Sequence, residues 1–243
     1  MTDRRDIVIA MGVLGLCLII AMFIFSSAWK QAKSTEQAIE ISGSSRKAIV
    51  SDLAVLGASI NAFGNSQGEA YRNLESQKPA VMSFLASKGF AKDKVTFSTM
   101  NNFPVNEMNE QGYSTGNVRG YNFSQRFEIQ SSDVQLIRTI SLELTALAEQ
   151  GISLNVESPQ FLYTKLQDVK AEVQAEAAKD AMLRAKKIAE ATGSSLGNIR
   201  SARLGVLQIT PKNSTEISDY GMNDVSAIEK EITATINASF EIE

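Results

Sequence analysis

The stretch AEAAKDAMLRAKKIAEATG, from Ala175 to Gly193, decides how the fold of this chain of 243 residues is interpreted. Eight of its nineteen residues are alanine or glycine. Its small residues recur at steps of three or four, which is the spacing of one face of an α-helix: Ala178, Ala181, Ala185 and Ala189. Such a stripe lets a helix axis approach a sheet or a second helix closely, while the charged side chains stay outside. We therefore expect a helix over about 166–192 whose alanine face is a packing surface.

Outward from this helix, strands and helices follow each other without regular alternation. Two further helices are expected, one after Ser66 that ends at Gly89 and one from about Ser132 to Gly151. The strand candidates are residues 38–43, 48–64, 94–100, 121–130, 152–163, 198–209 and 231–243. This order predicts an α+β fold, in which the helices pack on one face of a mainly antiparallel sheet. We treat residues 38–243 as one α+β domain.

Local sequence patterns predict where these two helices begin. Ser66 and Glu69 have the spacing of a capping box, and Ser132 and Gln135 repeat it. Pro79 lies inside the first of these helices and is expected to kink or split it, because proline cannot donate the helical hydrogen bond.

Two long polar segments, residues 101–119 and 210–227, contain many turn-forming residues. Loops of this length are uncommon in compact domains unless they are functional, bound to a partner or mobile. They are interpreted either as solvated loops or as arms that bind another subunit. Tyr113 and Tyr220 are the candidate assembly contacts, since aromatic side chains often anchor interfaces.

The N-terminal residues 1–29 form the expected membrane anchor. Residues 7–25 contain no charged side chain and, as a helix, would span roughly 28 Å, close to the hydrocarbon thickness of a bilayer. A polar linker is expected at residues 30–37. The alternative is a cleaved signal peptide, although such peptides usually have a shorter apolar run. The side chains expected to hold the anchor are Ile7, Leu14, Leu18, Phe25 and Trp29.

The composition excludes several chemistries. The chain has no histidine and one cysteine, Cys17, which removes histidine-dependent triads, histidine metal sites and an internal disulfide. We expect no catalytic, cofactor-binding or metal site, and therefore no enzyme. The net charge of −3 gives no reason to expect nucleic acid as a partner. Asp180 and Arg184 have the spacing of a solvent-exposed ion pair on a helix.

The region AAKDAMLRAKKIAEATGSSLGNIRSARLG, residues 177–205, resembles the signature of the SIMPL-domain family of bacterial envelope proteins. In that family an alanine-rich helix ends in glycine and is followed by Leu-Gly and a strand, here Gly193, Leu196 and Gly197. The segments IEISGSSRKAIVSDLAVLGASI and VRGYNFSQRFEI and the alternating terminal strand also match. The chain departs from the family at Asp52, where no proline precedes the aspartate.

The resemblance implies a non-enzymatic envelope protein that forms large homo-oligomers and is associated with oxidative-stress tolerance. The family includes proteins similar to the periplasmic immunogenic protein of pathogenic bacteria and to a stress-associated periplasmic homologue. We expect a ring or cage of copies, anchored in the inner membrane with the soluble domain in the periplasm. The expected partners are therefore the bilayer and other copies of the chain. The alternative is a periplasmic binding or chaperone module that acts in envelope stress, with an unidentified small-molecule ligand.

Overall fold

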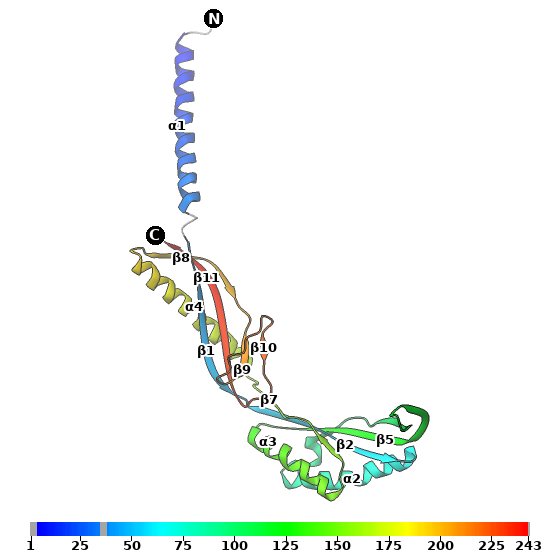
Figure 1. Cartoon of the computed structure of the whole chain (residues 1–243). Coiled ribbons are helices and arrows are strands. Elements are labelled where there is room, and N and C mark those ends of the chain that lie inside the picture. The colour runs from blue at the N-terminus through cyan, green and yellow to red at the C-terminus, as the bar shows by residue number, and fades with distance from the viewer. Residues whose placement is uncertain (1–3, 35–37, 243) are drawn as a thin grey trace. The chain divides into compact units, whose positions relative to one another are not determined.

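The computed structural model describes residues 4–34 and 38–242 (Figure 1). It begins with a long helix, α1 (Arg4–Ser34). The chain divides by its contacts into two units, each built from separate pieces, and α1 falls in the first of them. The first unit contains residues 1–46, 171–207 and 233–243, and the second contains residues 47–170 and 208–232.

The second unit is built on a six-stranded sheet. Its long central pair is β2 (Leu53–Gly64) and β5 (Ser114–Ser131), which run antiparallel from Ala54 opposite Ser131 to Gly64 opposite Tyr121. The edges are formed by β3 (Val95–Phe97) and β4 (Asn101–Met108) on β5, and by β6 (Leu154–Val156) and β7 (Gln160–Leu162) on β2. One face of this sheet is covered by α2 (Gln67–Ser87) and α3 (Val134–Glu143) (Figure 1).

The core of this unit lies between the sheet and the two helices. Strand β2 alternates strictly, so that every second side chain points at the helices and has almost no exposed surface. Burial of this apolar face stabilises the unit by roughly 25 cal/mol for each Å² removed from water. The largest buried side chains are Leu56, Ile60, Leu74, Val81, Leu85, Phe127, Ile129, Ile137, Ile140 and Leu144.

The predicted start of α2 is confirmed. The Ser66 side chain accepts a hydrogen bond from the Glu69 amide at 3.2 Å. The Glu69 carboxylate in turn accepts one from the Asn65 amide at 3.0 Å, so the box closes one residue earlier than the usual pattern. Pro79 was expected to kink or split this helix; the helix runs through Pro79 as one element, so the split is wrong. Gly89, with φ of +91°, follows the helix end in the left-handed region that glycine favours.

The helix α3 begins one residue later than predicted. Asp133, not Ser132, is the N-cap, and its side chain accepts a hydrogen bond from the Leu136 amide at 3.0 Å. The expected pair of Ser132 and Gln135 is wrong for this reason. After Glu143 the chain tightens into a 3₁₀ helix, η2 (Leu144–Gln150), which ends at Gly151 with φ of +78°. A second 3₁₀ turn, η1 (Lys92–Lys94), precedes β3.

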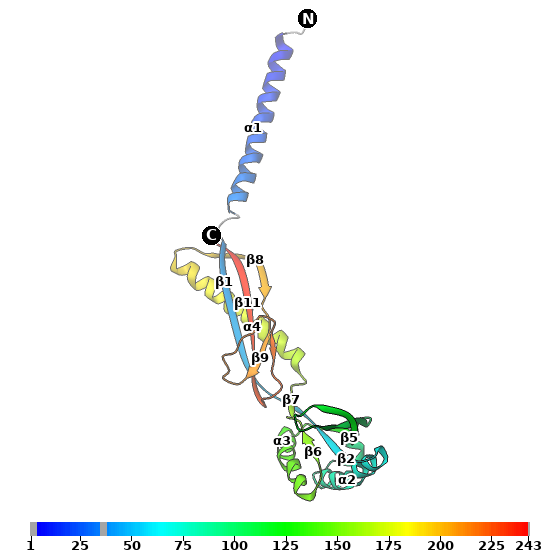
Figure 2. The same cartoon turned by 45° about the vertical axis from the view of Figure 1, so that its right-hand side comes forward.

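The first unit combines strands with the alanine-rich helix. Strands β1 (Ala38–Val50), β8 (Leu196–Leu204) and β11 (Glu229–Ile242) contribute to it, with β11 between the other two, and α4 (Leu166–Ala191) lies along them (Figure 2). Strand β11 alternates as predicted, and its inward side chains are Ala234, Ile236, Ala238 and Phe240. The short strands β9 (Gln208–Pro211) and β10 (Met222–Asn223) belong to the second unit; they pair in parallel, and β9 also adjoins β11.

The α+β prediction is confirmed, with two sheets that are mainly antiparallel. Two details differ. The first strand pair breaks at Ser51 and Asp52 and not near residues 44–47, because the alternation of β1 continues to Val50. Residues 101–119 are not a loop: they form most of a β-hairpin made by β4 and the start of β5.

Candidate functional site

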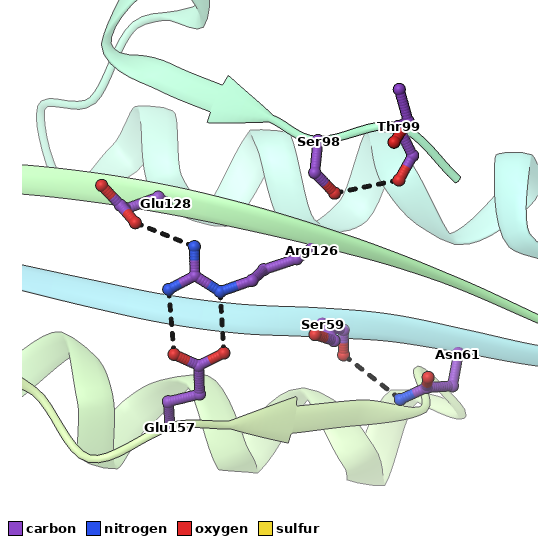
Figure 3. A network of polar contacts seen from close by, with 7 residues as sticks. All are labelled: Ser59, Asn61, Ser98, Thr99, Arg126, Glu128 and Glu157. Atoms are coloured by element: carbon purple, nitrogen blue, oxygen red, sulfur yellow. Dashed lines mark hydrogen bonds and ion pairs between the residues drawn. The ribbon is translucent and has the colours of Figure 1, made fainter. Parts of the chain in front are cut away.

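The face of the second unit's sheet that α2 and α3 do not cover is polar, and its centre is a charged network (Figure 3). Arg126 on β5 donates to both carboxylate oxygens of Glu157, from Nε at 2.8 Å and from Nη2 at 2.9 Å. Its Nη1 donates to Glu128 at 2.8 Å. The guanidinium lies over Gly57, where an added Cβ would collide with both Arg126 and Glu157.

This network is already satisfied internally. Hydrogen bonds from Arg126 hold the pKa of Glu157 below its ordinary range, and the two carboxylates raise the pKa of Arg126. The nearby side chains are neutral: Figure 3 shows Ser59 and Asn61 beside it, with the Asn61 amide donating to the Ser59 carbonyl at 3.4 Å. The arrangement ties β5 to the residue after β6. Because Arg126, Glu128 and Glu157 bond one another, none of these three charged groups is directed at a ligand. Across residues 4–34 and 38–242, no group of three or more His, Cys, Asp or Glu side chains has a metal-binding arrangement.

The β4–β5 hairpin is the most exposed ordered part of the second unit. Residues 101–119 are all exposed except Val105, although most of them form paired strands. The turn is fixed by Asn109, whose side chain accepts hydrogen bonds from the amides of Gln111 and Tyr113. Large apolar side chains lie open on the hairpin: Phe103, Met108, Tyr113 and Val118. Tyr113, predicted as an assembly contact, is 72% exposed.

The second predicted arm, residues 210–227, begins with the end of β9 and is interrupted by the two-residue β10, but it has no helix or strand at residues 212–221 and 224–227. Tyr220 lies in it and is 97% exposed. Two residues earlier, Ser218 is held by Gln208, whose side-chain amide donates to the Ser218 carbonyl at 2.6 Å. Tyr220 is therefore presented to solvent from a segment that is fixed at its base.

A buried lysine closes the end of this segment. Lys230 is 2% exposed, and its ammonium donates to the carbonyls of Phe161 at 2.5 Å and Asp224 at 2.6 Å. Desolvation lowers the pKa of Lys230, and the nearby Asp224 carboxylate opposes that shift. Lys230 thus joins three segments of the unit, which is a structural role that the sequence did not reveal.

In the first unit the alanine stripe of α4 is buried against the sheet. Ala181, Ala185 and Ala189 have no exposed surface. Ala178 is only partly buried, and Ala177 occupies the contact in its place. The buried positions advance by four residues at each step: Val173, Ala177, Ala181, Ala185 and Ala189.

Gly43 on β1 explains why the stripe must be small. A Cβ at Gly43 would lie 2.5 Å from the Ala181 amide nitrogen and 2.7 Å from the Ala181 Cβ. The Ser44 amide also donates to Asp180 at 2.9 Å, and Arg184 pairs with the same carboxylate at 2.8 Å. The Asp180–Arg184 pair predicted from the sequence is therefore present, and it additionally fastens the helix to β1.

Beside this contact lies an apolar hollow of about 420 Å³ between α4 and β8. We call it the α4–β8 hollow. Its lining residues are Ala178, Lys179, Met182, Leu196, Gly197, Asn198, Ile199 and Phe240.

The apolar helix α1 carries the predicted anchor. Met11–Trp29 is long and apolar enough to cross a membrane, and none of it is buried against other parts of the chain. Leu14, Leu18, Phe25 and Trp29 are all exposed, and the rings of Phe25 and Trp29 lie 5.9 Å apart. The side chain of Ile7 lies outside the described residues. The helix continues to Ser34 through the start of the expected linker, and residues 35–37 also lie outside the described part.

The fold is α+β and is preceded by an apolar helix long enough to cross a membrane, a combination that fits an envelope protein. The chain belongs to the SIMPL family, whose members are described as proteins of unknown function (DUF541), because the family model matches residues 39–240. That match indicates no enzyme family.

Comparisons outside the family add little. No curated protein matches the chain. One similar solved structure is a crystal structure from Burkholderia cenocepacia, described as a candidate amidohydrolase/peptidase. It is 17% identical with a TM-score of 0.21, and the match covers 51% of this chain and 29% of that one. The chain thus spans less than a third of that structure's length, and the similarity carries no argument about activity.

Two residues that shape these surfaces, Gly43 and Lys230, carry little signal in the sequence. Gly43 lies inside the quoted segment IEISGSSRK, but a glycine within a strand pattern signals only a close backbone approach and names no partner. Lys230 is the inward residue in the alternation of β11, and this was the one available sign that a lysine would be buried.

Proposed function

We propose that the protein is a non-enzymatic, membrane-anchored envelope protein that assembles into a large homo-oligomer, as a ring or cage. The observation that carries the proposal is the β4–β5 hairpin. A two-stranded hairpin is marginally stable in water on its own. This hairpin exposes both of its faces and four large apolar side chains, so a partner surface would remove that apolar area from water.

The partner proposed is another copy of the chain. Anchors such as α1 hold all copies in one membrane plane, and each copy added to an assembly raises the membrane avidity of the whole. Tyr113 on the hairpin and Tyr220 on the 212–221 segment are proposed as contacts, because both are exposed aromatics on segments fixed at their bases.

Light scattering of the full-length protein in mild detergent tests the assembly. We expect one particle several times the mass of the 26.4 kDa chain. Tyr113→Ser or Tyr220→Ser should reduce that mass, whereas Leu142→Ser on α3, where Leu142 is also highly exposed, should not. A monodisperse monomer would overturn the proposal. An unchanged assembly in both tyrosine variants would remove only the assigned contacts.

The proposed location is the inner membrane, with the soluble part in the periplasm. The apolar Met11–Trp29 helix supports an anchor or a signal peptide equally in composition, and its length favours the anchor. The mass of the protein isolated from cells distinguishes the two, because cleavage after the apolar run would remove about the first 28 residues. An alkaline phosphatase fusion at the C-terminus should be active if the soluble part is periplasmic.

The proposed link to oxidative or envelope stress rests on the family resemblance. A strain that lacks the protein should then be more sensitive to hydrogen peroxide. Equal survival of that strain and its parent would overturn this part alone.

The second candidate function is a binding or chaperone module, and the α4–β8 hollow favours it. A volume of about 420 Å³ falls within the range of small-molecule pockets, about 300–1,000 Å³. Mass spectrometry of the natively purified protein should then detect a bound small molecule.

A further inference from the structure

The α4–β8 hollow has the chemistry of a site for hydrocarbon. Its apolar lining includes Met182, Ile199 and Phe240, and the first two of these are more than half exposed. Leu183, the next residue on α4, is also exposed. Exposed apolar side chains gathered around a hollow are a surface that water solvates poorly.

Lysines flank this apolar surface along the helix. Lys179, Met182, Leu183 and Lys186 share one face of α4, since they follow the i, i+3, i+4, i+7 spacing. Lys179 pairs with Glu176 at 2.7 Å, and Lys186 lies 3.9 Å from Glu190. These acidic partners limit any attraction to anionic headgroups. The apolar contact therefore carries the binding, with the lysine stems extending it.

The register of the strands places the hollow at one particular end of the first unit. Phe240 lies opposite Ile199, and Ile242 lies opposite Leu196, at the start of β8. Ser42 bonds Asn237, and Ser51 bonds Ile228. From Ser42 to Ser51, just past the end of β1, the bonded partner falls from Asn237 to Ile228, just before β11, so the two strands run antiparallel. The first residue of β1, Ala38, therefore lies near Glu241 and within about two strand spacings, or roughly 10 Å, of the hollow.

The chain length between the anchor and β1 bounds the distance to the bilayer. The four steps from Ser34 to Ala38 span at most about 14 Å. The helical residues from Trp29 to Ser34 add about 7.5 Å. The hollow is thus tied to within about 30 Å of the end of the apolar span, whatever the direction of the tether.

We propose that the α4–β8 hollow binds an acyl chain of a membrane lipid. The inference rests on the proposed retention of α1 as a membrane anchor, because the tether then keeps the hollow within about 30 Å of the apolar span and so within reach of the bilayer. The hollow opens beside apolar side chains with lysines on either side, which is the pattern of protein surfaces that enter the headgroup region.

Fluorescence quenching by brominated lipids tests the proposal in the full-length protein. The single native tryptophan is first replaced by Trp29→Phe. Ile199→Trp or Met182→Trp then places a reporter at the hollow. The matched control is Leu204→Trp: Ile199 and Leu204 lie on the same strand, face α4, and are both 57% exposed. Leu204 lies five residues farther from the tether.

Each variant is reconstituted into phosphatidylcholine–phosphatidylglycerol vesicles, with or without bromine on the lipid acyl chains. We expect brominated lipid to reduce the fluorescence at positions 199 and 182, and to leave position 204 nearly unchanged. Thermal melting followed by circular dichroism checks that each variant is folded. If one of the two reporter variants does not fold, the other still tests the proposal.

Several results would overturn the inference. Equal fluorescence in both lipids at positions 199 and 182 excludes an acyl chain in the hollow. Equal quenching at position 204 shows unspecific contact with the bilayer. Fluorescence that follows protein density and not bromine shows that a second copy fills the hollow. Flotation of the vesicles separates the two proposals: protein that does not float has no retained anchor, whereas protein that floats without quenching refutes the acyl-chain site alone.

Discussion

Gly43 is the position where one added carbon atom should destabilise the fold most. A Cβ there collides with the Ala177 carbonyl and the Ala181 amide, which are backbone atoms and cannot move away as a flexible side chain could. We expect Gly43→Ala to lower the free energy of unfolding by about 1–3 kcal/mol, as in other overpacked cores. Urea denaturation measures this.

Gly68→Ala is the matched control for that substitution. A Cβ at Gly68, in the first turn of α2, meets only the flexible end of Arg72 at 3.4 Å. Alanine should be neutral or slightly stabilising there, because glycine is a poor helix residue. If both variants were equally stable, the contact between β1 and α4 would have room for a Cβ at Gly43, and the predicted overpacking would be wrong.

Glu157 should contribute to the acid sensitivity of the second unit. Its pKa is lowered from an ordinary value of 4.5 by hydrogen bonds from Arg126. Between the lowered pKa and 4.5 the unfolded chain binds more protons than the folded chain, so the free energy of unfolding falls as the pH falls through this window. Glu157→Gln should therefore be less stable than the wild type near neutral pH, and the difference should shrink below the folded-state pKa.

Denaturant titrations across acidic pH measure this difference. Glu149→Gln, at an exposed position at the end of η2, provides the control and should leave the profile unchanged. A constant gap between the Glu157→Gln variant and the wild type at every pH would mean that the carboxylate acts only through its shape.

At the level of elements, α4 offers a test within one helix. Ala181→Leu should overpack the contact with β1 and cost about 1–3 kcal/mol, because Ala181 has no exposed surface. Ala178→Leu should be tolerated, since Ala178 lines the α4–β8 hollow and has room beside it. Thermal melting of the two variants decides the matter. Equal loss in both would show that the helix faces are assigned incorrectly.

Most elements could be predicted from the sequence because they carry their own signals. The α4 spacing, the Ser66 cap and the strict alternation of β11 are local patterns, and each is found where it was expected. The β4–β5 hairpin was missed for the opposite reason. Both of its faces are exposed, so its strands lack the alternation between apolar and polar residues that identifies a half-buried strand.

The surfaces were harder to predict than the elements. Choosing Ala178 over Ala177 required knowing which side of α4 meets Gly43, and that depends on a residue more than 130 positions away. The Arg126 network likewise joins residues 31 positions apart across Gly57. Long-range pairings of this kind leave no local pattern in a single sequence.

For the whole molecule, the anchor gives the most direct prediction. A chain that lacks residues 1–34 should fractionate with soluble proteins, whereas the full-length protein should stay with membranes after alkaline carbonate washing, because only the intact chain contains Met11–Trp29. Immunoblots of the two fractions measure this. If the full-length gene yielded a product of reduced mass in the soluble fraction, the helix would be shown to be cleaved.

Because each unit is built from separate pieces of chain, neither unit can be isolated by cutting the chain once. The boundaries fall at residues 46/47, 170/171, 207/208 and 232/233, and the first and last lie inside β1 and β11. Neither unit is a contiguous stretch that could be excised, expressed alone or exchanged with a relative by one cut. A nonsense mutation anywhere before Thr233 removes strand residues from both units at once. Truncations from the C-terminal end should therefore unfold both units, and no half of the protein should survive them.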